Sequence, residues 1–141
     1  MFFSFVTLAV ACAIAYVAWQ QWRLARHRFR LDLFERRYKV YDATKKFVSL
    51  GQFDDPQLFE FNAGTADAEF LFDSRVTEYL REVRKRAVSV RTHQKIFEHM
   101  PVGEERSRHV EAAHGDLLWL TEQITDMTKV FTPYLSFSHI K

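Results

Sequence analysis

Few side chains in this sequence have the type and spacing that chemistry requires, and the most suggestive are Glu111 and His114. A Glu-x-x-His spacing places both side chains on one helix face, as in bundles that hold two carboxylate-bridged iron ions. Such a site also needs a second pair of this kind and two further glutamates, and the sequence has no second Glu-x-x-His. We therefore predict no metal and no cofactor, while a metal-dependent enzyme on a helical bundle stays open as an alternative.

The other candidates for catalysis or ligand binding are isolated. His93, His99 and His109 lack the four-residue spacing with which two histidines on one helix chelate zinc. Cys12 is the single cysteine, so the chain can form neither an internal disulfide nor a thiolate cluster. There is also no glycine-rich phosphate loop and no G-x-S-x-G motif. This pattern predicts a protein that is not an enzyme and has no evident small-molecule substrate.

The strongest pattern in the chain is an N-terminal apolar segment. Residues 1–19 contain no charged side chain and, as a helix, would be about 28 Å long, close to the roughly 30 Å hydrocarbon core of a bilayer. A cleavable secretory signal is disfavoured because no basic side chain precedes the segment. A buried core helix is also disfavoured, because one small domain has too little protein to surround an apolar helix on every side. The sequence predicts a single-pass transmembrane anchor over residues 1–22.

Aromatic and basic residues follow this segment in the order expected at a membrane surface. We predict that six of them lie at the interface: Trp19, Trp22, Arg23, Arg26, Arg28 and Arg30. The arginines either bind anionic lipid headgroups or act only as a topology signal, and both alternatives stay open. By the positive-inside rule, the N-terminus then lies outside and residues 23–141 form a cytoplasmic domain.

Small residues share one face of the apolar segment at steps of four, four and three: Thr7, Ala11, Ala15 and Ala18. Such faces let membrane helices approach closely, which predicts self-association or pairing with another membrane protein. The alternative, that alanine is simply frequent in such segments, stays open. A membrane-disrupting effector, with this segment as its active part, is a further alternative function.

Beyond residue 22, apolar residues recur at steps of three and four, which predicts helices. Long helices are expected over residues 23–50, 74–100 and 104–131. The first should continue the membrane helix without a break and end at Gly51, and Pro133 should stop the last. Similar lengths and the short turn at Pro101 predict an all-α antiparallel three-helix bundle, with this turn at its membrane side.

The connection between the first two long helices is acidic and aromatic. Residues 47–74 contain six acids and no bases, whereas residues 75–97 contain seven bases and two acids. Asp55-Pro56 and Thr65 resemble helix starts, so short helices within residues 55–72 should cap the distal end of the bundle, with residues 132–141 folded back there. The opposite charges favour contact with a second copy, and we expect no nucleic-acid partner.

Three stretches also form a recognisable pattern: Leu31 to Thr44 (LDLFERRYKVYDAT), Ala68 to Phe72 (AEFLF) ahead of Tyr79, and Pro133 to Leu135. The pattern resembles a group of small bacterial single-pass membrane-anchored helical proteins with no established activity, and it covers most of the domain after the anchor. The resemblance implies a bacterial inner membrane and implies no site.

The anchor, the patterned bundle and the lack of usable chemistry together predict an interaction or scaffold protein. It would oligomerise through coiled-coil-like helix packing or serve as an accessory subunit of a membrane complex.

Overall fold

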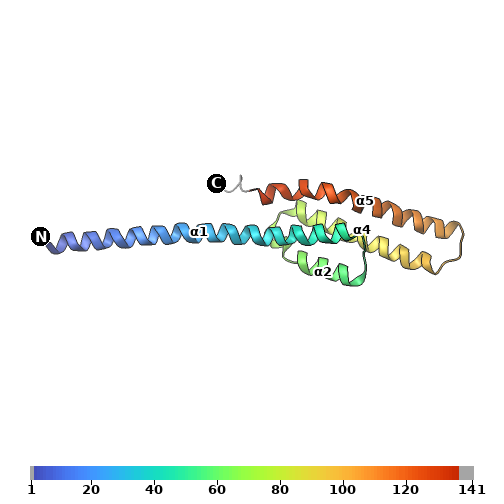
Figure 1. Ribbon diagram of the computed structural model, residues 1–141, viewed down its shortest axis with the longest axis horizontal. Coiled ribbons are helices and arrows are strands. Elements are labelled where there is room, and N and C mark those ends of the chain that lie inside the picture. Colours follow the sequence, from blue (N-terminus) through green and yellow to red (C-terminus); the bar gives the residue numbers. More distant parts are fainter. Residues whose placement is uncertain (1, 137–141) are drawn as a thin grey trace. The chain divides into compact units, whose positions relative to one another are not determined.

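The computed structural model describes the backbone of residues 2–136 and the side chains of residues 6–136. Every regular element in that range is a helix, which confirms the all-α class (Figure 1). The helices are α1 (Phe2–Leu50), α2 (Asp55–Thr65), α3 (Ala68–Leu71), α4 (Ser74–Glu98) and α5 (Glu104–Leu135). The chain divides into two compact units, residues 1–35 and residues 36–141.

The first unit is the N-terminal part of α1. Its backbone is helical without interruption from Gln20 to Arg30, so the predicted continuity at this junction is confirmed. In the described part of the chain, no helix combines enough length with enough apolar character to cross a membrane. Residues 1–5, the beginning of the predicted span, lie outside the described side chains.

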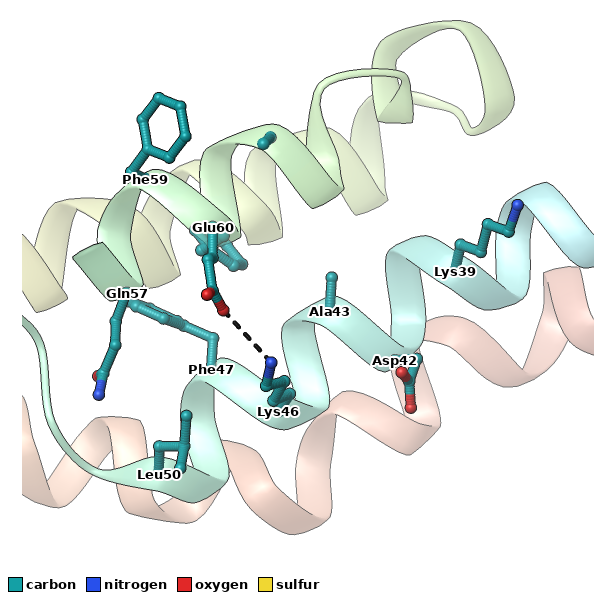
Figure 2. A pocket seen from close by; sticks show the side chains of 11 residues that line it. Lys39, Asp42, Ala43, Lys46, Phe47, Leu50, Gln57, Phe59 and Glu60 are labelled. Carbon is teal, nitrogen blue, oxygen red and sulfur yellow. Dashed lines mark hydrogen bonds and ion pairs between the residues drawn. The ribbon is translucent and has the colours of Figure 1, made fainter. Parts of the chain in front are cut away.

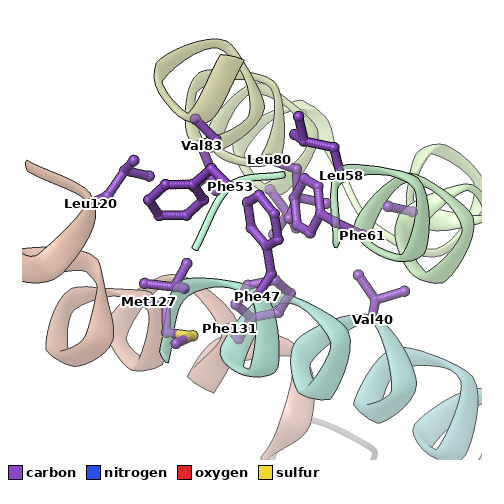
Figure 3. Packing of buried hydrophobic residues seen from close by; sticks show 14 of the residues in the cluster. Val40, Phe47, Phe53, Leu58, Phe61, Leu80, Val83, Leu120, Met127 and Phe131 are labelled. Atoms are coloured by element: carbon purple, nitrogen blue, oxygen red, sulfur yellow. The ribbon is translucent and has the colours of Figure 1, made fainter. Parts of the chain in front are cut away.

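The second unit buries its apolar residues between the last part of α1 and helices α2, α4 and α5 (Figure 3). The buried positions of α4 recur at steps of three and four: Val76, Leu80, Val83, Ala87 and Val90. Facing them, α5 buries Ala113, Leu120, Met127 and Phe131. The predicted stripe of α4 is buried, whereas two predicted positions of the α5 stripe, Val110 and Ile124, are exposed. The buried residues of both helices meet in one core.

The path of the chain through this unit differs from the predicted bundle. Instead of capping an end, α2 runs back along α1, where the rings of Phe47 and Phe61 stack with centroids 4.4 Å apart. Because α2 reverses the chain, α4 runs in the same direction as α1, and α5 returns antiparallel to α4 (Figure 1). Tyr134 consequently lies beside Arg37, where α1 enters the unit, and the Pro101 turn lies at the opposite end. The predicted placement of that turn was wrong.

Local sequence explains where α1 ends and α2 begins. Gly51 terminates α1 with a φ of 64°, a left-handed conformation that glycine adopts without strain, as predicted. The N-cap of α2 is Asp54, one residue before the predicted cap, and its carboxylate accepts a 3.0 Å hydrogen bond from the backbone N–H of Gln57. Pro56 lies in the first turn, where its missing N–H costs nothing.

Two predicted helix ends were wrong. Thr65 ends α2 and starts no helix. Helix α5 does not stop before Pro133 but continues to Leu135. A proline in the last turn forfeits one backbone hydrogen bond, and the turn is still closed by the N–H of Ser136, which donates to the carbonyl of Thr132 at 3.1 Å. The predicted fold-back of the C-terminus reaches residues 137–141, which lie outside the described residues.

Candidate functional site

The residues of the predicted association face lie in the first unit, and their side chains are exposed: Thr7, Ala11, Ala15 and Ala18. Large apolar side chains on the other faces of this helix are also at least half exposed: Val6, Leu8, Val10, Ile14, Tyr16 and Val17. From Val6 to Ala18 the helix carries no charged side chain. It is therefore apolar around its whole circumference, unlike the amphipathic helices of the second unit.

All six predicted interface residues follow on the same helix: Trp19, Trp22, Arg23, Arg26, Arg28 and Arg30. The guanidinium of Arg23 lies over the ring of Trp19, 5.5 Å from its centroid. One turn on, the guanidinium of Arg26 lies 5.1 Å from the ring centroid of Trp22. A guanidinium that lies over a ring can still donate N–H groups to an anionic group. The contacts of Arg23 with Trp19 and of Arg26 with Trp22 were not predicted from the sequence.

A groove of about 400 Å³ lies between α1 and α2 in the second unit (Figure 2). The buried rings of Phe47 and Phe61 line it, and at its rim Lys46 forms a 3.3 Å ion pair with Glu60. This exposed pair contributes little to stability because water screens it. The groove was not predicted from the sequence, because α2 was expected at the end of the bundle and not along α1.

Some carboxylates of the acidic connection, residues 47–74, form ion pairs with basic side chains of the same chain. Asp55, at the start of α2, forms an ion pair with Arg91 of α4, and the ammonium of Lys95 lies 3.9 Å from the same carboxylate. Glu60 pairs with Lys46 of α1. These carboxylates are thus matched without the second copy that the charge pattern suggested.

A network around Arg37 joins four helices where α1 enters the second unit. Its guanidinium donates to the backbone carbonyls of Leu71, at 3.0 Å, and of Tyr134, at 3.4 Å. The Tyr134 hydroxyl donates to a carboxylate oxygen of Asp73 at 2.5 Å, while the other oxygen of that carboxylate caps α4 by accepting from the backbone N–H of Arg75. The tyrosine hydrogen bond lowers the pKa of Asp73 and raises the pKa of Tyr134.

We expect this network to make the second unit less stable in acid. Because the pKa of Asp73 is lower in the folded chain than in the unfolded chain, its stabilising contribution is present above the unfolded pKa. The contribution is lost as the pH falls through the folded pKa. Tyr134→Phe removes the hydrogen bond, so the difference in free energy of unfolding between wild type and this variant should shrink from neutral pH to strong acid. Urea unfolding at both pH values measures it, and a constant difference would refute the assignment.

Two histidines that are far apart in the sequence are in contact. The Nδ1 atoms of His93 on α4 and His109 on α5 lie 2.8 Å apart, and both residues are half-buried. His93 follows the buried Val90 by three residues and His109 precedes the buried Ala113 by four, so both continue the apolar seam between the two helices. These two spacings can be read from the sequence, but they indicate a histidine pair only once the register of α4 against α5 is known.

The remaining predicted candidates for chemistry do not come together. Glu111 and His114 are exposed on α5, His99 contacts the backbone carbonyl of Lys95, and Cys12 is exposed on α1. In the described residues, no group of three or more histidine, cysteine or acidic side chains is placed to hold a metal ion.

No protein-family model, curated protein or solved structure matches this chain. The resemblance of residues 31–44, 68–72 and 133–135 to bacterial membrane-anchored proteins stays a prediction.

Proposed function

We propose that this protein is a membrane-anchored interaction protein, in which residues 1–22 form a single-pass anchor and residues 23–141 a helical domain that binds protein partners. The observation that supports this proposal most is the exposed, uncharged circumference of α1 from Val6 to Ala18. A helix that is apolar on every face requires lipid or protein around it. With the apolar residues 1–5, the segment has the length of a hydrocarbon core.

The stacked aromatic and basic residues support an orientation. Trp19 and Trp22 follow the apolar segment, and indole rings favour the headgroup level of a bilayer. Arg23 and Arg26, stacked on these rings, add positive charge on the C-terminal side. By the positive-inside rule the domain faces the cytoplasm and the N-terminus lies outside. The resemblance to bacterial membrane-anchored proteins implies that this membrane is a bacterial inner membrane.

The surface of the second unit supports a role in protein contacts. Besides their buried seam, α4 and α5 leave large apolar side chains at least 40% exposed, including Val88, Leu118 and Ile124. Apolar surface of this kind favours association with other proteins when it is contiguous. The partner class is a second copy of the chain or another membrane protein. Neither nucleic acid nor a small-molecule substrate is proposed.

Charges placed inside the anchor test the proposal. Val10→Asp combined with Ile14→Asp should move the full chain out of the membrane fraction, because each aspartate near the centre of a span disfavours insertion by about 3 kcal/mol. Val102→Asp combined with Phe70→Asp is the matched control, because these side chains are 90% and 85% exposed in the second unit. The measurement is the share of protein that stays with membranes after alkaline carbonate washing. Release of the wild-type chain by carbonate would overturn the anchor.

The interaction role needs a separate measurement. Native mass spectrometry of the full chain, extracted in mild detergent, reports copy number and bound subunits together. We expect a homo-oligomer or a complex with a second membrane protein. A monomer without bound protein, under conditions that preserve other membrane complexes, would contradict the role.

A further inference from the structure

We propose that His93 and His109 form a binding site for one divalent transition-metal ion, with Cu²⁺ and Ni²⁺ preferred, that links α4 to α5. The inference goes beyond the proposed function and does not depend on the membrane anchor. It rests on the contact between the two Nδ1 atoms across the α4–α5 seam.

A hydrogen bond between the two imidazoles requires that one Nδ1 atom carries a free lone pair, which is what binds a metal ion. The two Nδ1 atoms lie at hydrogen-bond distance, 2.8 Å, and a hydrogen bond between them needs one nitrogen that donates a proton and one that accepts it with its lone pair. The accepting imidazole is therefore unprotonated at Nδ1, which is the form that binds metals. The ring centroids are 5.1 Å apart and the ring planes differ by 43°. A metal ion that replaces this proton would receive both lone pairs once each ring has turned to direct its Nδ1 atom at the ion.

The separation favours one class of ion. With metal–nitrogen bonds of about 2.0–2.1 Å, two ligands at a right angle have nitrogens about 2.9 Å apart, whereas two ligands at a tetrahedral angle need about 3.3 Å. The observed 2.8 Å is close to the right-angled arrangement. Square-planar and octahedral coordination use this angle, so Cu²⁺ and Ni²⁺ fit with less movement of α4 against α5 than Zn²⁺.

The surroundings allow a cation to bind at the surface edge of the seam. Both histidines are half-buried, so protein holds the rings on one side while water can complete the coordination on the other. Arg91, two residues before His93, has its charge matched by Asp55. A site with two protein ligands is weaker than a closed structural site, and we expect a dissociation constant on the order of micromolar.

The first test is calorimetric titration of the full chain, purified without a histidine tag in mild detergent, with Ni²⁺. We expect one equivalent to bind, with affinity at least tenfold lower in His93→Gln and in His109→Gln. The matched controls are His99→Gln and His114→Gln, because both residues are exposed and neither touches another histidine in the described structure. Equal affinity in wild type and His93→Gln, or an equal loss in the controls, would overturn the site.

The second test does not depend on how well a variant folds. Electron paramagnetic resonance of the wild-type chain with one equivalent of Cu²⁺ counts the nitrogens bound to the metal. We expect two imidazole nitrogens in the wild-type chain and in both control variants. A wild-type spectrum with one nitrogen or none would overturn the proposal, whatever the variants show.

Discussion

Phe131→Ala is expected to lower the free energy of unfolding of the second unit by about 3–5 kcal/mol, the range observed when a buried phenylalanine is truncated. The Phe131 side chain is fully buried on α5. Its ring packs edge-on against the rings of Tyr41, Phe72 and Tyr79, with centroids 5.5, 5.5 and 6.2 Å away. Truncation would leave a cavity bordered by α1, the loop after α3, and α4. Urea unfolding followed by circular dichroism measures the loss.

Phe70→Ala is the matched control for this prediction. The Phe70 side chain is 85% exposed, so its truncation removes little buried surface and should change the free energy of unfolding by less than about 0.5 kcal/mol. Equal effects of the two substitutions would contradict the described core. Melting of the first unit does not obscure the comparison, because neither substitution lies in residues 1–35.

Gly64→Ala is expected to destabilise the second unit by about 1–3 kcal/mol, the usual cost of overpacking a closely packed site. A Cβ atom at Gly64 of α2 would lie 2.6 Å from the Cβ atom of Ala43 on α1, well inside van der Waals contact. Both atoms are attached directly to backbone, so no side-chain rotation relieves the clash and the two helices must separate. Separation would also disturb the stacked rings of Phe47 and Phe61.

Gly115→Ala is the control, and it is expected to have the opposite sign. Gly115 also lies within a helix, and a Cβ atom there meets nothing within 4 Å. Alanine should therefore stabilise α5 by about 0.5–1 kcal/mol through its higher helix propensity. Ala43→Gly should recover part of the loss in the Gly64→Ala background, because it removes the opposing methyl group. Failure of that rescue would place the destabilisation outside this contact.

Features that depend on neighbouring residues could be predicted from the sequence. The three- and four-residue period of the apolar residues predicted the helix α4, because helical period is a property of the segment itself. Gly51 predicted the end of α1, because a left-handed residue is needed there and glycine adopts it.

Features that depend on which surfaces meet could not be predicted. Apolar stripes are chemically alike, so their period does not show that α2 pairs with α1 rather than covering an end of the bundle. The close approach at Gly64 requires that pairing to be known. The contact between His93 and His109 likewise depends on the register of α4 against α5, and the apolar period of each helix does not determine that register.

The hydrogen bond from Arg37 to the carbonyl of Tyr134 joins residues 97 positions apart, and this separation imposes an order on biosynthesis. At about 5–20 residues per second, a ribosome needs roughly 5–20 s to add the intervening chain. During that interval Tyr41 of α1 has been made, but Phe131 of α5, whose ring packs against it, has not. Helices α4 and α5, joined by a short turn, can pair as soon as both have emerged. The nascent chain therefore carries an uncovered apolar surface on α1 until translation is nearly complete.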